Sequence, residues 1–414
     1  MNRVYRVRLS AHNQEKTVLS RPFSGAHRTR MLAAVGAAAA VATTAIVAAN
    51  VHAESNDGLG SCHDTGDGYG VCVTMPVDDK PDETINSEMA RHIEATEKGD
   101  TIRMAMYEWQ LADDESDGPE KIAEALVDAH DRGVDAEVVL GDTTDLRDGK
   151  DVNKKLRQLL NDSGVPYKVC MDACVDVDPD NRKGAMHNKF VLIERGDDNT
   201  ILQSSANLLE VQARSPQNML INRNDDALFE YLSENWEKLK AEKRWDHSDI
   251  ERLGDKDSKA YIFRRDKGDP FLAILKHVTE CTPEHNKVWL TASGGSLGGE
   301  KVLARLAEMQ DELGCDVRVN VSVGDNNEKA VEDAGIDKDK AMSLSRNHNK
   351  LLYIDATYND KTGPVAFTGS YNALDTGTSL RFNDEVMIRC ADTDVTTWYE
   401  GYFELMFDNA SNRT

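Results

Sequence analysis

Two short stretches of this 414-residue chain decide its fold, because each repeats the other. Residues 186–194 are MHNKFVLIE and residues 347–355 are NHNKLLYID. A turn of small residues that contains Asn follows each stretch, SSAN at 204–207 and TGSYN at 368–372. In each stretch a His-Asn-Lys tripeptide leads into a short apolar run, which indicates a strand. Its recurrence, each time with the same kind of turn downstream, indicates an internal duplication.

The segments around the two motifs repeat in the same order. Before the first motif the pattern predicts a helix at 85–98, a strand at 101–107, a helix at 119–132 and a strand at 134–140; before the second it predicts a helix at 271–279, a strand at 288–291, a helix at 299–313 and a strand at 316–323. Closing helices are expected at 226–241 and 395–407. This alternation predicts an α/β fold of two duplicated units related by a pseudo-two-fold axis, each a mixed, largely parallel sheet flanked by helices.

The first 53 residues differ from the rest of the chain. Seven cations and one acid precede an uncharged stretch rich in Ala and Val at 31–49, and the small-residue sequence Val51-His52-Ala53 follows. This order is typical of a secretory signal peptide, so we expect the protein to be secreted. The apolar stretch is long enough to span a bilayer, which leaves an uncleaved N-terminal membrane anchor, with the protein facing outside, as the alternative.

The remaining chain divides at the duplication. We expect a disulfide-held N-terminal segment at 54–83, a first half at 84–245, a charge-dense linker at 246–268 and a second half at 269–414. All seven cysteines lie beyond residue 53, and pairing of nearest neighbours predicts the disulfides Cys62–Cys72, Cys170–Cys174 and Cys281–Cys315. Cys390 is left over after an apolar run, where a buried free thiol is expected. The cysteine spacing does not suggest a metal site.

Composition and charge exclude several classes of protein. With 40% apolar and 29% charged residues, the chain suits a folded globular protein rather than a disordered or fibrous one. Asp and Glu number 73 against 49 Lys and Arg, a formal charge of −24. Such an acidic protein repels polyphosphate at long range, which argues against non-specific nucleic-acid binding but leaves room for a local basic pocket.

The repeated motifs carry residues suited to phosphate chemistry. Residues i and i+2 of a strand point to the same side, so His187 projects with Lys189 and His348 projects with Lys350. The downstream turns add hydroxyl and amide groups from Ser205, Asn207, Ser370 and Asn372. Brought face to face, the two sets would supply two imidazoles and several donors for phosphate oxygens. The sequence therefore predicts a site for phosphoryl transfer.

At these residues the chain resembles the phospholipase D superfamily, whose signature, His-x-Lys-x4-Asp followed by Gly-Ser-x-Asn, occurs twice. The second copy matches throughout, including Asp355 and Gly369, whereas the first has Glu194 in place of the Asp and Ser204 in place of the Gly. The resemblance covers roughly residues 84–408. It implies an active site at the interface of the two halves that needs no metal and no cofactor.

The resemblance also implies roles for the motif residues. His187 would attack phosphorus and form a phosphohistidine, while His348 would protonate the leaving oxygen and then activate water or an alcohol. The opposite assignment of the two imidazoles is the alternative. The groups expected to bind the phosphate oxygens are Lys189, Lys350, Asn207, Asn372, Ser205 and Ser370.

In this family a carboxylate before a later strand often supports the catalytic imidazole. The second half has Asp384 and Glu385 at that place, and the first half has Gln217. We therefore expect Gln217 to support His187 and the carboxylates to lie near His348, with Asp355 supporting the second motif. A similar amide occurs on the nucleophile side of tyrosyl-DNA phosphodiesterases, which keeps nucleic acid among the candidate substrates.

These expectations lead to one principal function. We expect a secreted, lipid-degrading phospholipase D that hydrolyses glycerophospholipids at a membrane or micelle surface, with or without transfer of the phosphatidyl group to an alcohol. No obligate protein partner is implied. The alternatives are a secreted nuclease or other phosphodiesterase that uses the same site, and a binding protein without catalysis.

Overall fold

The computed structural model describes residues 59–112, 118–142, 151–175, 184–246, 250–263, 265, 267–293, 299–375 and 380–411. The predicted signal peptide at 1–53 lies outside the described residues. The chain separates into the units Met1–Thr43 and Thr44–Thr414, and every described residue belongs to the second unit. Within the described ranges, no helix is both long and apolar enough to cross a membrane.

Eight strands form the first sheet, in the order β1-β2-β8-β7-β6-β3-β4-β5. Their bounds are β1 Ser61–Asp64, β2 Tyr69–Thr74, β3 Thr101–Met106, β4 Asp135–Gly141, β5 Tyr167–Cys170, β6 Lys189–Arg195, β7 Asp198–Ser204 and β8 Gln217–Arg223. The motif strand β6 lies at the centre, between β3 and β7.

The second sheet has the order β14-β13-β12-β15-β16-β17-β10-β9, and β11 pairs with β15 beside this path. Its strands are β9 Glu251–Leu253, β10 Ser258–Phe263, β11 Val278–Glu280, β12 Lys287–Ala292, β13 Asp316–Ser322, β14 Ala341–Leu344, β15 Lys350–Tyr358, β16 Lys361–Gly369 and β17 Glu385–Cys390. When the strand order is followed from β5 in the first sheet and from β14 in the second, equivalent strands come in the same order. In this order β6 corresponds to β15. The fold therefore contains the predicted duplication.

Both sheets are mixed, as predicted, but neither is largely parallel. Parallel pairing is confined to β3-β4-β5 and β12-β13-β14. The physical reason is the length of the connections: parallel neighbours need a crossover, whereas antiparallel neighbours need only a tight turn. Helices supply the crossovers early in each half, and short turns then join β6 to β7 and β15 to β16.

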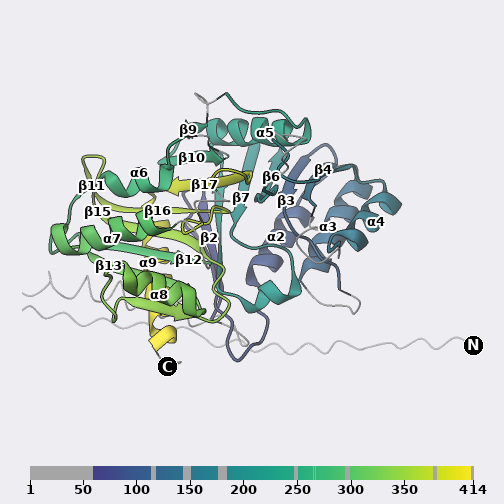
Figure 1. The fold of residues 1–414 in the computed structure, drawn as a ribbon. Coiled ribbons are helices and arrows are strands. Elements are labelled where there is room, and N and C mark those ends of the chain that lie inside the picture. The colour runs from purple at the N-terminus through teal and green to yellow at the C-terminus, as the bar shows by residue number, and fades with distance from the viewer. Residues whose placement is uncertain are drawn as a thin grey trace, which may run out of the picture. The chain divides into compact units, whose positions relative to one another are not determined.

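The helices are α2 Thr84–Glu94, α3 Pro119–Arg132, α4 Lys154–Ser163, α5 Asp226–Lys240, α6 Pro270–Lys276, α7 Glu300–Leu313, α8 Asp325–Asp333 and α9 Thr393–Ser411, with a 3-10 helix, η1, at Glu210–Arg214. Figure 1 shows α3 and α4 beside β4, and α7 and α8 beside β13. Helix α3 matches its predicted bounds because Pro119 suits a first turn and Gly133 ends the helix in the left-handed conformation, at φ 92°.

Side chains alternate between two cores along each motif strand. Phe190 and Leu192 of β6 enter a central core that also holds Leu351 and Tyr353 of β15, together with residues of α5 and α9. The intervening residues Val191 and Ile193 enter the outer core of the first half. Burial on both faces explains why the motif strands contain the unbroken apolar runs 190–193 and 351–354. The closing helices reach across the halves, since α5 contacts β9 and β10 and α9 contacts β2.

Two segments that were predicted to lie outside the duplicated halves contain strands of the sheets. The segment at 54–83 includes β1 and β2, which pair with each other, and β2 also pairs with β8. The proposed linker at 246–268 includes β9 and β10, which occupy the equivalent edge of the second sheet beside β17. The interpretation as a linker is therefore wrong for the residues of β9 and β10. β9 is the edge strand, and its three residues are exposed to solvent.

Candidate active site

The two motifs occupy equivalent corners of the two sheets. Lys189 is the first residue of β6 and Lys350 is the first residue of β15, with each His two residues earlier. Each lysine Nζ donates to the backbone oxygen of its own His, at 2.8 Å in both halves. Because β6 and β15 run antiparallel to β3 and β12, both motifs lie where the parallel strands end.

Hydrogen bonds between the halves bring these corners together. The backbone N–H of His187 donates to the backbone oxygen of Asp384 at 2.9 Å, and that of His348 donates to the backbone oxygen of Pro216 at 3.2 Å. The motif residue Asn349 accepts a hydrogen bond from the Asn218 side chain at 3.0 Å. Each motif is thus attached to the strand start of the opposite half, and the two imidazoles share one site.

The partners of the imidazoles cross between the halves. Oε2 of Glu385 lies 2.9 Å from Nδ1 of His187, and Oε1 of Gln217 lies 3.1 Å from Nδ1 of His348. The expected pairing, in which Gln217 supports His187 and a carboxylate supports His348, is therefore wrong. Strands β8 and β17 begin at the contact between the halves, so their first side chains reach the opposite motif.

The carboxylate of Glu385 is buried and held from two sides. Asn383 Nδ2 donates to Oε1 at 3.1 Å, and His187 contacts the other oxygen. Burial raises the pKa of Glu385, but the charge and hydrogen bond of His187 outweigh burial and leave that pKa below its ordinary value. For His187, burial lowers the pKa, and the charge of Glu385 opposes that effect only in part. We infer a neutral imidazole beside an ionised carboxylate.

The second imidazole has no carboxylate at hydrogen-bond distance among the described residues. Burial is the main reason that the pKa of His348 lies well below its ordinary value, and the charges of Lys350 and Lys189 lower it further. Nζ of Lys350 lies 3.1 Å from Nδ1 and 3.3 Å from Nε2 of this ring. The protonated form of His348 is therefore disfavoured until a negative charge enters the site.

Both lysines are buried close to the imidazoles. Burial lowers the pKa of Lys189 to about 8, against the opposing charges of Glu385 and Glu108. Burial also lowers the pKa of Lys350 well below its usual value, and the charge of Lys189 adds to this effect. Two buried cations so near each other favour a bound anion.

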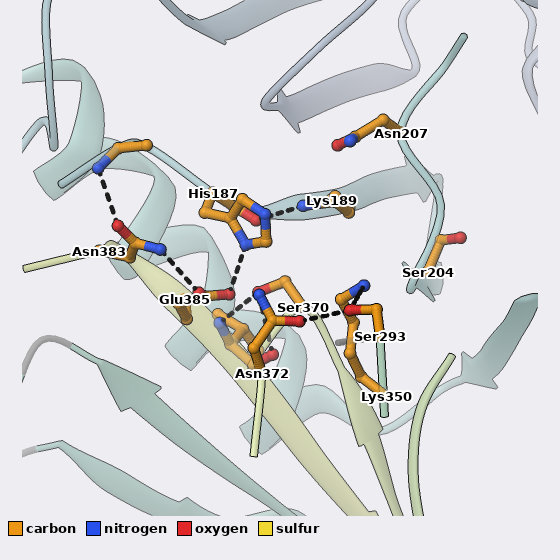
Figure 2. Close-up of polar contacts among 12 residues, drawn as sticks. His187, Lys189, Ser204, Asn207, Ser293, Lys350, Ser370, Asn372, Asn383 and Glu385 are labelled. Carbon is orange, nitrogen blue, oxygen red and sulfur yellow. Dashed lines mark hydrogen bonds and ion pairs between the residues drawn. The ribbon is translucent and has the colours of Figure 1, made fainter. Parts of the chain in front are cut away.

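The amide and hydroxyl groups surround the lysines. Figure 2 shows Lys189 and Asn207 on one side of the site and Lys350 and Asn372 on the other. Ser205 donates to Oε1 of Gln217 at 3.2 Å, so this serine fixes the partner of His348 rather than standing free for phosphate. In the second half, Ser370 contacts the backbone of Val386 and hydrogen-bonds the carboxylate of Glu385.

The two asparagines are held in opposite senses. Asn207 Nδ2 donates to Oε2 of the buried Glu108 at 2.9 Å, and its carbonyl oxygen is buried without a hydrogen-bond partner among the described residues. Asn372 instead accepts from the Ser293 hydroxyl at 2.7 Å, which leaves its NH2 group as the outward donor. The amide orientation in each case follows from the partner.

Two predicted supporting acids have other contacts. Oδ2 of Asp384 accepts from the backbone N–H groups of Cys174 and Val175, so it holds the disulfide loop that precedes the first motif. Asp355 lies five residues beyond Lys350 and pairs with His285 at 2.7 Å, away from the imidazoles. Its predicted support of the second motif is not observed, because its position along β15 takes it out of reach.

Four residues near the imidazoles were not assigned roles from the sequence. The Tyr107 ring lies 4.9 Å from the His187 ring and also contacts Nζ of Lys189. Ser293, the equivalent residue after β12, accepts from Lys350 at 3.1 Å. Glu108 accepts a hydrogen bond from Asn207, and Gln212 contacts the His348 ring. No sequence pattern singles out Gln212 on η1.

The cysteines form the three predicted disulfides, Cys62–Cys72, Cys170–Cys174 and Cys281–Cys315. Cys390 is a buried free thiol, and burial raises its pKa to about 12. Three disulfides fit an extracellular protein. In the ranges that the structure describes, no group of three or more His, Cys, Asp or Glu residues is placed to hold a metal ion.

Comparisons with known proteins agree with this architecture. Residues 89–240 match the sequence model of a family described as cardiolipin synthase, PLD-like domain. The structure is similar to that of a phosphatidylserine synthase from Haemophilus influenzae Rd KW20, with a TM-score of 0.53 and 10% identity over 90% of this chain and 91% of that one. No curated protein matches the chain in sequence.

A second similar structure is a polyphosphate kinase from Porphyromonas gingivalis. The TM-score is 0.51, and the identity is 12% over 81% of this chain. The match spans 50% of the kinase, so the chain corresponds to about half the length of that enzyme. At such low identities, the two structures show a shared fold and leave the substrate open.

Proposed function

Because the chain belongs to the phospholipase D superfamily, we propose that it is a phosphodiester-cleaving enzyme that works through a phosphohistidine and acts on glycerophospholipids. The observation that carries the chemistry is the crossed support of the imidazoles, in which Nδ1 of each ring is held from the opposite half. This contact fixes the ring and leaves Nε2 for the reaction.

In the first step, His187 is the nucleophile. Glu385 holds the proton on Nδ1, so the lone pair of Nε2 attacks phosphorus. The bond between phosphorus and the leaving oxygen breaks, and His348 gives a proton to that oxygen. The positive charge that develops on the phosphorylated ring is stabilised by the Glu385 carboxylate.

The second step reverses the proton transfer. His348, now neutral, takes a proton from a water molecule, whose oxygen attacks phosphorus. The phosphorus–nitrogen bond breaks, and its electron pair returns to Nε2 of His187. Lys189, Lys350 and the NH2 group of Asn372 would bind the non-bridging oxygens through both steps.

Three considerations support a phospholipid substrate. The matching family is described as cardiolipin synthase, PLD-like domain. One similar structure, of which the match covers 91%, is a phosphatidylserine synthase. The formal charge of −24 disfavours association with nucleic acid or another polyanion. Export, proposed from the N-terminal sequence, agrees with the three disulfides and would bring the enzyme to lipid outside the cell.

The test is choline release from phosphatidylcholine vesicles in excess chelator, with His187→Ala and His348→Ala as matched controls. We expect turnover by the natural protein and loss of turnover in both variants. Plasmid nicking without choline release would identify a nuclease instead. Inactivity on lipid, nucleic acid and a simple aryl phosphodiester would contradict catalysis altogether.

A further inference from the structure

The 3-10 helix η1 places the side chain of Gln212 beside the ring of His348. Nε2 of the Gln212 carboxamide lies 3.4 Å from Nε2 of the imidazole. Oε1 of Gln212 accepts from the backbone N–H of Asn207 at 2.7 Å. Because a backbone N–H can only donate, this contact settles which end of the carboxamide is the oxygen. The group that faces Nε2 of His348 is therefore the NH2 group, a donor.

The carboxamide of Gln217, at the other ring nitrogen, is oriented by Gln212. Its NH2 group donates to the backbone oxygen and to Oε1 of Gln212, both at 3.2 Å. Because a backbone oxygen can only accept, the Gln217 oxygen is the atom that lies 3.1 Å from Nδ1 of His348. The Ser205 hydroxyl donates to the same oxygen, while its own oxygen accepts from the backbone N–H of Asn218 at 3.0 Å. Gln217 thus offers Nδ1 an acceptor.

The two carboxamides together favour one tautomer of the neutral His348 ring. An acceptor at Nδ1 and a donor at Nε2 fit a ring that carries its proton on Nδ1 and its lone pair on Nε2. In the opposite tautomer, the Nε2 proton would meet an NH2 group and the Nδ1 lone pair would meet a carbonyl oxygen. Gln212 contributes to both contacts, because it holds Gln217 in place and also faces Nε2 itself.

The other groups near the ring act on its total charge. Burial lowers the pKa of His348 most, the charges of Lys350, Lys189 and His187 lower it further, and the backbone oxygen of Ser205 raises it. Nζ of Lys350 lies 3.1 Å from Nδ1 and 3.3 Å from Nε2. A cation so nearly equidistant from both nitrogens lies over the face of the ring rather than along either lone pair. Lys350 therefore opposes a second proton and leaves the choice of nitrogen to the carboxamides.

We propose that Gln212 is a positioning residue that selects the Nδ1-protonated tautomer of His348 and so presents the lone pair of Nε2 to the second step. That lone pair takes the proton of the attacking hydroxyl group, whether of water or of an alcohol. The hydroxyl oxygen forms the new bond to phosphorus, the bond from phosphorus to Nε2 of His187 breaks, and that nitrogen keeps the electron pair.

The contact between Gln212 and Nε2 is long enough to be exchanged. At 3.4 Å it lies beyond the usual range of a hydrogen bond, so the attacking hydroxyl group can replace it at small cost. Gln212 thus holds the tautomer in the resting enzyme without blocking the nitrogen. This inference rests on the proposed function for the second step, but the tautomer itself can be measured without turnover.

The experiment is ¹⁵N NMR of protein labelled with ¹⁵N-histidine, at a pH where His348 is neutral. A ring nitrogen that carries a proton and one that carries a lone pair resonate far apart, and the His348 signals are assigned by their absence in His348→Ala. Gln212→Met keeps much of the side-chain volume but removes the carboxamide. Val211→Ala, on the exposed side of η1, is the matched control. The signals of the other histidines report whether the fold is intact.

We expect a protonated Nδ1 and an unprotonated Nε2 in the natural protein and in Val211→Ala. In Gln212→Met the two resonances of His348 should converge, because the ring then exchanges between tautomers. Steady-state turnover of bis(p-nitrophenyl) phosphate should fall about tenfold in this variant, the effect of losing roughly one hydrogen bond. The first p-nitrophenol should still be released in a burst, since the first step with this leaving group needs no acid.

Three results would count against the proposal. A proton on Nε2 in the natural protein, or unchanged His348 resonances in Gln212→Met, would overturn the selection of the tautomer by Gln212. Converged resonances with unchanged turnover would overturn its part in the second step. The expected resonances in a natural protein that cleaves no diester would uphold the tautomer and overturn the proposed function instead.

Discussion

The two halves share one arrangement of strands but differ at the imidazoles. His187 has a buried carboxylate, Glu385, at Nδ1 and an aromatic neighbour, Tyr107. His348 lies between the amides of Gln217 and Gln212. The duplication supplies two equivalent motifs, and a few side chains around them make one ring a supported nucleophile and the other an easily deprotonated acid and base.

The lysine environments differ in the same way. Lys189 lies near the ring of Tyr107, whereas Lys350 donates to the Ser293 hydroxyl at the equivalent position. Ser293 also fixes Asn372, which links the second lysine and the second asparagine into one hydrogen-bonded unit. A symmetric fold thus presents an asymmetric surface to phosphate, as a reaction with distinct attacking and leaving groups requires.

The largest effect should come from removing the imidazoles one at a time. His187→Ala removes the nucleophile, so turnover should fall by roughly 10^4-fold or more on every diester. His348→Ala should cost about 10^2- to 10^4-fold with an alkyl leaving group, which needs a proton. With p-nitrophenyl, a good leaving group, the first step should survive and release a burst of p-nitrophenol.

The burst is the discriminating measurement. Stopped-flow absorbance on bis(p-nitrophenyl) phosphate should show a burst for His348→Ala and none for His187→Ala. A burst in His187→Ala but not in His348→Ala would mean that the roles of the two halves are exchanged.

A smaller effect is expected from the partner of the nucleophile. Glu385→Gln keeps a group of similar size but removes the charge that stabilises the phosphorylated ring. We expect kcat to fall about 10- to 100-fold with little change in KM. Steady-state kinetics check this, with unfolding temperature as the control. An unchanged kcat would mean that the Glu385 carboxylate does not assist His187 in the reaction.

The pH profile follows from the lowered pKa values of both imidazoles. Cleavage needs neutral His187 and protonated His348, and the pKa of each lies below 6.5. Activity on alkyl diesters should therefore rise as pH falls from 7, reach its maximum below pH 6.5, and decline once His187 takes up a proton. Gln217→Glu adds a carboxylate beside His348, so it should raise that pKa and move the maximum upward. A maximum above pH 7 in the natural protein would contradict this assignment.

Binding should weaken at higher pH through the lysines. The pKa of Lys189 is about 8, so this cation loses its charge as pH rises through 8. Affinity for the phosphate should then decline, and KM for a soluble diester should rise several-fold between pH 7 and 9. Lys189→Arg stays charged over this range, and its KM should be flat. The same rise in that variant would assign the effect to another group.

The smallest effects on activity should come from removing the disulfides. One of them contributes mainly to stability, and another lies in a loop next to the site. Cys281–Cys315, with a separation of 34 residues, should contribute about 4 kcal/mol to the free energy of unfolding, while Cys170–Cys174, with a separation of 4, should contribute about 2 kcal/mol. The shorter bridge lies in the loop held by Asp384, so its removal should lower activity more. Denaturant unfolding and turnover of Cys→Ala pairs test this division.

Much of the fold could be predicted because its elements carry local patterns. Helix α3 has Pro at its start and Gly after its end, and β6 and β15 contain the apolar runs 190–193 and 351–354. Strands β9 and β10 were missed because β9 has only three residues, all exposed, and β10 lies in a charge-dense segment. Pairing of β10 with β17 and of β9 with β10, rather than any local preference, makes them part of a sheet.

The residues of the site were predictable, but their partners were not. The spacing of His and Lys in each motif is local, so their projection from one strand start follows from the sequence. Which ring Glu385 faces depends on how the two halves meet, and sequence order carries no such information. Gln212 was missed for the same reason, because only the arrangement of the two halves brings η1 next to the ring of His348.

The most direct test of the account is the site of the covalent intermediate. The protein should be mixed with bis(p-nitrophenyl) phosphate in the His348→Ala background, quenched in alkali to preserve the phosphorus–nitrogen bond, digested, and examined by mass spectrometry. We expect a p-nitrophenyl phosphoryl group on His187. When Glu385→Gln is added, we expect this group to be lost more slowly or to form in lower yield. A modified residue other than His187, or no covalent adduct despite a burst of p-nitrophenol, would contradict the division of labour between the two halves.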